Sequence, residues 1–257
     1  MYNTGRLCRP VFILKVIDVT IKRIKRVSAV IVAAGESRRM GTDKLMMELA
    51  GVPVLLHALR AFEVSPVITE IIVVTRADML EQVAELGVNG GIKKLTKVIA
   101  GGDTRTESVQ NGLYAVSRRA KLIAIHDGAR PLVSQQIIYD AVNCAEKYNA
   151  ATPAVPVKST IKQVKNNVVT STPERSELYE VQTPQVFDVA LIKGAIAAAM
   201  KDGKRYTDDC SAVEAIGATV HITKGSYENF KLTTPEDLLV AEIMMGLAAL
   251  RQAGSGA

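Results

Sequence analysis

The chain has 257 residues, of which 48% are hydrophobic, and it carries a formal net charge of +6. This length allows one domain with a sizeable core, and three scattered cysteines without CxxC spacing argue against a disulfide framework or a zinc site. No apolar run approaches the ~20 residues that span a bilayer. We therefore expect a protein of the reducing cytoplasm with no membrane partner.

Residues 1–26 are expected to form a basic extension of unknown role. They hold seven Lys and Arg residues and one acidic residue, Asp18, whereas the chain from residue 27 onward is formally neutral. A basic segment can bind RNA or anionic lipid, but the chain has no tryptophan and few aromatic residues with which to stack bases. We expect a solvated leader and no nucleic-acid partner. Disorder, an added strand and upstream sequence from an early start codon stay open as interpretations.

From residue 27 onward, apolar runs rich in β-branched residues alternate with helical patterns, which is typical of a parallel sheet with helices on both faces. The expected strands are 27–32, 70–75, 97–100, 122–126, 151–157 and 218–223. The expected helices are 54–62, 77–86, 107–117, 134–148, 189–202 and a last one that Thr234 caps. The sequence thus predicts one α/β domain over residues 27–250, with a doubly wound, mostly parallel sheet that binds ligands at the carboxyl ends of its strands.

One segment, at about residues 157–180, interrupts this alternation. Strand-like runs at 158–164 and 168–171 flank Asn166-Asn167, residues that tolerate the positive φ of a tight hairpin turn. A hairpin has no obvious place in the core of an α/β sheet, so we expect it to project as an arm. Because such arms often exchange between subunits, the sequence predicts a homodimer formed through this arm.

The first expected strand runs directly into Ala33-Ala34-Gly35, and Arg39 and Lys44 follow four and nine residues beyond the glycine. Small residues let backbone N–H groups approach phosphate oxygens, and two cations can neutralise a triphosphate. The loop matches neither GxxxxGK[ST] nor GxGxxG. It predicts a phosphate cradle of another kind, for which an ordinary glycine turn with surface cations is the plainer interpretation.

Polar groups also follow other expected strands. Residues 101–108 open a helix and offer amide donors and a hydroxyl, and Asp127 ends a strand, where a carboxylate can serve Mg²⁺ or a ligand hydroxyl. Thr207-Asp208-Asp209 and residues 229–233 add polar groups late in the chain. Each segment also has a plainer interpretation. Residues 101–108 could be only a capped helix entrance, and Asp127 only a turn aspartate paired with Arg130. Thr207-Asp208-Asp209 or residues 229–233 could be merely a helix cap or a solvated lysine.

In this order, these segments resemble the cytidylyltransferase family of the non-mevalonate isoprenoid pathway over about residues 27–247. That family makes 4-diphosphocytidyl-2-C-methyl-D-erythritol and pyrophosphate from CTP and 2-C-methyl-D-erythritol 4-phosphate. The resemblance implies a Rossmann-like nucleotidyltransferase fold, a homodimer, and Mg²⁺ or another divalent cation as cofactor. A ribitol 5-phosphate cytidylyltransferase and a non-catalytic CTP-binding regulator remain alternatives, because both could use the same phosphate cradle.

The resemblance also implies roles for individual residues. The implied catalytic residues are Arg39, Lys44 and Lys231. The implied nucleotide-binding residues are Ala33, Ala34, Gly35, Gly102, Asp103 and Ser108. The implied acceptor-binding residues are Asp127, Thr160, Arg175 and Thr207, with Asp127 also at the metal, Thr160 and Arg175 reaching the partner's site, and Thr183-Pro184-Gln185 as a wall. The chain departs from the family pattern at Glu36-Ser37 and around Lys44.

Overall fold

The computed structural model describes residues 26–35, 45–203 and 206–254, with side chains up to residue 247. Most of the basic extension and the loop that contains Arg39 and Lys44 lie outside these residues. The strands are β1 (Val27–Ala33), β2 (Glu48–Leu49), β3 (Val52–Pro53), β4 (Ile68–Thr75), β5 (Leu95–Ala100), β6 (Leu122–Asp127), β7 (Ala150–Pro156), β8 (Gln163–Lys165), β9 (Val168–Ser171), β10 (Tyr179–Val181), β11 (Gln185–Asp188) and β12 (His221–Lys224). The helices are α1 (Val54–Glu63), α2 (Leu80–Asn89), α3 (Arg105–Ala115), α4 (Gln135–Tyr148), α5 (Val189–Asp202), α6 (Asp209–Ala215) and α7 (Pro235–Gly254), with 3-10 turns η1 (Ala77–Met79) and η2 (Arg175–Glu177).

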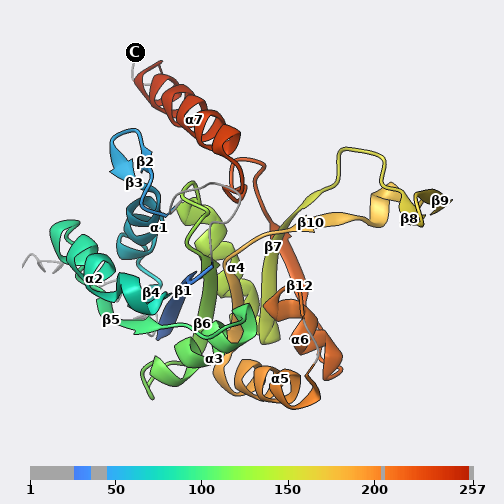
Figure 1. The fold of residues 1–257 in the computed structure, drawn as a ribbon, viewed down its shortest axis with the longest axis horizontal. Helices are drawn as coiled ribbons and strands as arrows, with labels where there is room; N and C mark the ends of the chain where they lie inside the picture. Colours follow the sequence, from blue (N-terminus) through green and yellow to red (C-terminus); the bar gives the residue numbers. More distant parts are fainter. Residues whose placement is uncertain (1–25, 36–44, 204–205, 255–257) are drawn as a thin grey trace, which may run out of the picture.

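The central sheet is mostly parallel and has β1 in its interior. Strands β7-β11-β6-β1-β4-β5 are hydrogen-bonded neighbours in this order; β10 pairs with the same edge of β7 as β11, and β12 pairs with the other edge of β7. From β1 the chain passes to β4 and β5 on one side and then returns to β6 on the other side of β1 (Figure 1). Such a reversal opens a crevice at the carboxyl ends of the strands. The predicted doubly wound fold is confirmed.

Strand β1 is buried on both faces because its apolar side chains alternate between two cores. Ala29 and Ile31 belong to a core shared with α1, α4 and Ala241 of α7, whereas Val30 belongs to a core shared with α3, α5 and α6. Figure 1 shows the two groups of helices on opposite sides of the sheet. Helix α3 lies directly on β1, since a Cβ at Gly112 would come within 2.5 Å of Val30. Among the described residues, no helix is long and apolar enough to cross a membrane.

Most predicted elements are present, with shifted ends. The predicted helix 77–86 is divided into η1 and α2, and helix α3 begins two residues early because Thr104 forms a capping box with Glu107. Strand β12 begins only at His221. The last helix starts after Thr234 as predicted, and the Asp237 carboxylate in its first turn accepts from the backbone N–H of Thr234 at 2.9 Å.

The sequence did not predict β10, β11, α6 or the β2–β3 hairpin. Strands β10 and β11 run antiparallel to β7 on the same side of it, and the Gln182 N–H between them donates to the Pro153 carbonyl at 2.8 Å. These strands are short and include polar residues such as Glu180 and Gln185, so they lack the apolar run that marks the parallel strands. The sheet is therefore mixed at this end.

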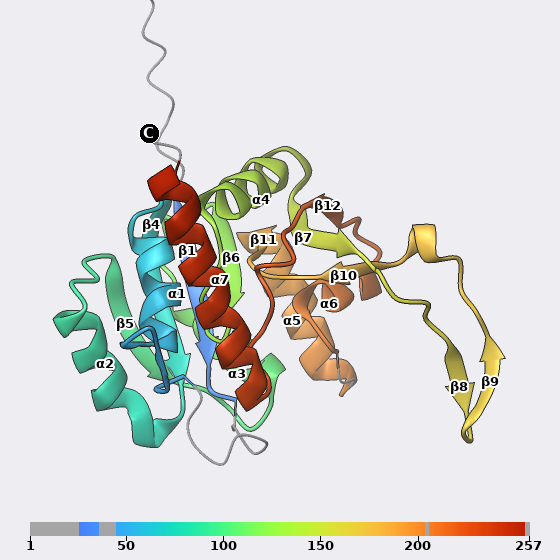
Figure 2. The same cartoon turned by 90° about the horizontal axis from the view of Figure 1, so that it is seen from above.

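The predicted arm projects from the body of the molecule, with the β8–β9 hairpin at its tip (Figures 1 and 2). Asn166 and Asn167 form its turn with φ angles of 52° and 62°, as their sequence indicates. Strand β8 is shorter than the predicted run at 158–164, whereas β9 has the predicted bounds, and Val164, Val168 and Val169 are more than half exposed. The arm thus presents apolar side chains that the rest of the described chain leaves uncovered.

Candidate active site

A cleft of about 720 Å³ opens at the carboxyl ends of β1, β4 and β6. The last residues of these strands line it, because Ala33 pairs with Thr75 and Val32 pairs with Asp127 across the sheet. Three loops that are distant in sequence therefore converge at one edge, as expected where the strand order reverses.

One wall of the cleft is made of small residues and backbone. A Cβ on Gly101 would lie 2.6 Å from both the Cβ of Ala34 and the Oγ of Ser108, so only glycine fits where the two loops meet. A Cβ on Gly35 would meet no atom of the described residues within 4 Å, so none of them covers the backbone there. Bare backbone of this kind can approach phosphate oxygens closely.

The start of α3 forms the adjoining wall. Thr104 accepts from the backbone N–H of Glu107 at 3.1 Å, and the Glu107 carboxylate accepts from the Thr104 N–H at 3.0 Å. The Ser108 hydroxyl accepts from the N–H of Gly102 at 3.2 Å. The positive end of a helix dipole thus faces the cleft. The structure places six predicted nucleotide-binding residues around this one cleft: Ala33, Ala34, Gly35, Gly102, Asp103 and Ser108.

A second cavity, of about 620 Å³, adjoins the cleft. Arg105, Asp127 and Lys231 line both cavities, so the two meet at a charged junction. The second cavity is also lined by Thr207, an implied acceptor-binding residue, and by Thr183. Two joined compartments with cations between them suit a reaction in which two anionic substrates must meet.

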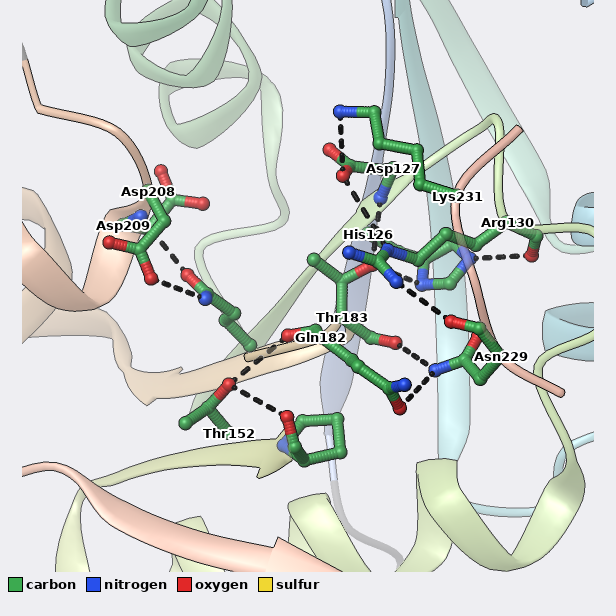
Figure 3. Close-up of polar contacts among 12 residues, drawn as sticks. His126, Asp127, Arg130, Thr152, Gln182, Thr183, Asp208, Asp209, Asn229 and Lys231 are labelled. Carbon is green, nitrogen blue, oxygen red and sulfur yellow. Dashed lines mark hydrogen bonds and ion pairs between the residues drawn. The ribbon is translucent and has the colours of Figure 1, made fainter. Parts of the chain in front are cut away.

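Asp127 lies at this junction among three cations. Its Oδ2 is 3.0 Å from Nζ of Lys231 and 3.7 Å from Nε of Arg130, and its Oδ1 is 3.8 Å from Nη2 of Arg105 (Figure 3 shows the first two). Burial alone would raise the pKa of Asp127, but Lys231, Arg105 and Arg130 outweigh it and lower this pKa to about 2. The carboxylate therefore stays ionised beside these three cations.

Arg105, which lines both cavities, and Asp209 form an ion pair that the sequence analysis missed. The Arg105 guanidinium donates to both carboxylate oxygens of Asp209, at 2.9 and 2.7 Å. Burial raises the pKa of Asp209, and the adjacent Arg105 opposes that rise. The Asp209 N–H in turn donates to Oε1 of Gln185 at 3.0 Å. Both residues lie in segments that the sequence analysis had identified, 101–108 and 207–209, but no sequence pattern indicates that they pair with each other.

A buried polar network supports Asp127 from below (Figure 3). The Thr183 hydroxyl accepts from the Asp127 N–H at 3.1 Å and lies 2.9 Å from Nδ1 of His126, whose Nε2 is 3.2 Å from the Arg130 carbonyl. Burial lowers the pKa of His126 to about 4, so the ring is neutral. A carbonyl can only accept, hence Nε2 carries the proton and Nδ1 accepts from Thr183.

Two implied site residues that the structure describes, Thr160 and Arg175, line neither cavity. Thr160 and Arg175 are on the exposed arm, where Arg175 donates to the Lys158 carbonyl at 3.2 Å. Arg39 and Lys44 fall in the loop that the structure does not describe. No group of three or more His, Cys, Asp or Glu residues that could hold a metal occurs in the described part of the chain. A metal role for Asp127 stays a prediction.

Comparison with known proteins gives one consistent family. Residues 27–247 match the family model for 2-C-methyl-D-erythritol 4-phosphate cytidylyltransferase. A relative of that name from Halalkalibacterium halodurans is 47% identical over 220 residues, which cover 85% of this chain and 96% of the relative. Another, from Caldanaerobacter subterraneus subsp. tengcongensis, is 44% identical over 223 residues, covering 85% and 98%.

Solved structures agree with these relatives. The 4-diphosphocytidyl-2C-methyl-D-erythritol synthase of Anaerococcus prevotii superposes with a TM-score of 0.78 at 30% identity, covering 86% of this chain and 96% of that one. The 2-C-methyl-D-erythritol 4-phosphate cytidylyltransferase of Thermus thermophilus gives 0.71 at 30% identity, covering 84% and 97%. The ribitol 5-phosphate and regulator alternatives are not favoured by these names. The chain belongs to the 2-C-methyl-D-erythritol 4-phosphate cytidylyltransferase family.

Proposed function

We propose that the chain transfers CMP from CTP to 2-C-methyl-D-erythritol 4-phosphate, releasing pyrophosphate. The observation that carries this proposal is the junction of two cavities at Arg105, Asp127 and Lys231. CTP occupies the cleft, with its triphosphate against the backbone around Gly35 and the start of α3. The acceptor occupies the second cavity, near Thr207, so that its phosphate meets the α-phosphate of CTP at the junction.

Charge, more than proton transfer, is the obstacle in this reaction. The nucleophile is a phosphate oxygen that is already anionic at neutral pH, so no strong general base is required. Its bond to the α-phosphorus forms as the bond to the β-phosphate oxygen breaks, and negative charge moves to the departing pyrophosphate. Lys231 and Arg105 supply fixed positive charge at the junction, and Arg39 and Lys44 are proposed to hold the β- and γ-phosphates.

We propose Mg²⁺, or another divalent cation, as cofactor. Mg²⁺ in nucleotide sites keeps several waters and is held by one or two carboxylates together with substrate phosphates. The described residues fit that pattern better than a protein cage, since Asp127 is a single carboxylate at the junction and no three-ligand group occurs among them. The ion would neutralise phosphate charge when bound.

We also propose a cytoplasmic homodimer formed through the arm. The exposed side chains of Val164, Val168 and Val169 would gain cover from a partner. The proposed roles of Thr160 and Arg175 agree with this arrangement, because in their own subunit both lie on the arm and line neither cavity. Each site would then be completed by the other subunit's arm.

The decisive experiment measures Mg²⁺-dependent pyrophosphate release from CTP with 2-C-methyl-D-erythritol 4-phosphate and, in parallel, with ribitol 5-phosphate. The assay is repeated with ATP, GTP and UTP. We expect turnover with CTP and the methylerythritol acceptor and much slower release otherwise. Faster release with ribitol 5-phosphate would overturn the proposed acceptor. Tight CTP binding without turnover of either acceptor would support a regulator instead.

A further inference from the structure

Lys231 lies on a loop between β12 and α7, yet this loop is held at defined points. The Gly225 N–H donates to the Ala154 carbonyl at 2.9 Å, and the Leu232 N–H donates to the Ala129 carbonyl at 2.8 Å. The Lys231 side chain is 39% exposed, so its contact with Asp127 is too solvent-screened to fix the loop by itself. Buried neighbours must therefore set its position.

Asn229, two residues before Lys231, is fully buried and lines neither cavity. Its Nδ2 donates to the Thr183 carbonyl at 2.9 Å and to Oε1 of Gln182 at 3.3 Å, and the main-chain carbonyl of Asn229 accepts from Nη1 of Arg130 at 2.7 Å (Figure 3). Both side-chain contacts are acceptors, which fixes the orientation of the Asn229 amide. The residue joins three segments of the site without touching substrate space.

Gln182 holds the same loop from the other side. Its Nε2 donates to the Ser226 carbonyl at 2.8 Å, and its Oε1 accepts from the Ser226 N–H at 3.3 Å. This two-point contact with backbone also fixes which end of the Gln182 amide faces Asn229. Gln182 and Asn229 together form a buried connection, here called the amide clamp, between the β10–β11 link and the loop of Lys231.

We propose that the amide clamp makes Asn229 a positioning residue for Lys231. The clamp holds the main chain of the lysine loop, and the Asn229 carbonyl holds Arg130, whose guanidinium faces Asp127. Because a misplacement of ~1 Å near reacting groups can cost ~10²-fold in rate, a buried residue without substrate contact can control turnover. The clamp acts on the acceptor side of the junction, since Gln182 lines only the second cavity.

The test is a double-mutant cycle in the full chain between Asn229→Ala and Lys231→Ala. We expect Asn229→Ala to lower kcat/KM for 2-C-methyl-D-erythritol 4-phosphate by ~10- to 100-fold, with less than about a twofold change in KM for CTP. In the Lys231→Ala background, the same substitution should lower kcat/KM by less than about a further twofold, because the Lys231 side chain that Asn229 positions is already absent. A full repeat of the loss in that background would overturn the proposal.

A matched control is Asn111→Ala. Asn111 is another asparagine that bridges a helix to the end of a strand, donating to the Ala100 carbonyl at 3.1 Å on the nucleotide side. Any loss that it causes should repeat in full in the Lys231→Ala background, since it lies outside the amide clamp. If the effect of Asn111→Ala were reduced in the Lys231→Ala background as much as that of Asn229→Ala, the non-additivity would reflect a general loosening of the fold. That result would contradict the proposal.

Folding is monitored by circular dichroism and thermal unfolding, because Asn229→Ala removes the amide that donates to the Thr183 carbonyl and so lowers stability. If that variant does not fold, Gln182→Met removes the other half of the clamp while keeping a similar volume, and the same non-additivity with Lys231→Ala is expected. The inference rests on the proposed function, but the two fail differently. Wild-type protein without turnover refutes the function, whereas additive losses in an active enzyme refute the clamp.

Discussion

The guanidinium of Arg105 donates two hydrogen bonds to the carboxylate of Asp209, with N–O distances of 2.9 and 2.7 Å, although the two residues are 104 positions apart in the sequence. Arg105 is the first residue of α3 and Asp209 is the first residue of α6. The pair therefore ties a wall of the nucleotide cleft to an element beside the acceptor cavity. Asp209 is almost completely buried, so its charge depends on this one arginine.

Removing Arg105 alone should destabilise the fold more than removing Arg105 and Asp209 together. Arg105→Met leaves a buried carboxylate without its partner, and we expect the free energy of unfolding to fall by about 3–5 kcal/mol. The double variant Arg105→Met/Asp209→Leu removes the charge as well and should recover part of that loss. Urea unfolding of both variants provides the measurement. A double variant no more stable than Arg105→Met would contradict this account.

The sequence could predict the parts of this molecule that depend on local pattern. The apolar run of β1 predicts a strand buried on both faces, and Asp127 falls at a strand end because the apolar run of β6 stops there. Since parallel strands share one carboxyl edge, these local predictions also placed Gly35, Ser108 and Asp127 in one cleft. The turn at Asn166-Asn167 could likewise be predicted from its two residues alone, because asparagine tolerates the positive φ that the turn requires.

Removing the Lys231 ammonium should lower the rate and leave the fold intact. A cation directed at developing charge is commonly worth a factor of ~10²–10³, and we expect Lys231→Ala to lose that much in kcat. Its side chain is 39% exposed, so the thermal midpoint should change little. Lys224→Ala, at an exposed lysine on β12 that lines neither cavity, is the matched control. Wild-type turnover by Lys231→Ala would refute the assigned role.

His126 predicts a specific pH dependence of stability. Burial lowers its pKa in the folded protein to about 4, whereas an unfolded histidine titrates near 6.5. The unfolded state therefore binds the proton first, and the stabilisation is complete above pH 6.5 and is lost as the pH falls toward 4. Over this window the free energy of unfolding should fall by roughly 1.4 kcal/mol per pH unit on account of this group.

The contribution of His126 can be isolated by difference. His126→Asn keeps a neutral polar side chain but has no titrating ring, so the stability gap between wild type and variant should narrow as the pH falls from 6.5 to 4. Denaturant unfolding at several pH values measures the gap. A gap that stays constant over this range would show that His126 titrates alike in the folded and unfolded states.

Interactions between distant segments were beyond sequence reasoning. Gln185 binds the start of α6 through its side chain, and Asn229 binds the β10–β11 link, but an isolated Gln or Asn gives no pattern that names its partner. The antiparallel strands β10 and β11 were missed for the same reason, because pairing with β7 stabilises them more than their own composition does. Tertiary contacts decided these features.

The arm allows a test of whether each site is built from two subunits. In Arg175→Ala the arm no longer carries the cation proposed to reach the partner, and in Arg39→Ala a subunit loses a cation proposed for its own site. Each homodimer should have low activity. A mixed dimer, however, holds one site with both arginines, since the Arg175→Ala subunit keeps its own Arg39 and receives Arg175 from its partner.

We therefore expect activity to return when the two inactive proteins are mixed and allowed to exchange subunits. Random exchange at equal concentrations makes half of the dimers mixed, each with one intact site, so recovery should approach about a quarter of wild-type activity. Two Arg175→Ala preparations mixed in the same way are the control and should stay inactive. Exchange is verified with two distinguishable tags. If tagged mixed dimers form and activity does not return, Arg175 does not act in the neighbouring site, and the arm serves only to hold the subunits together.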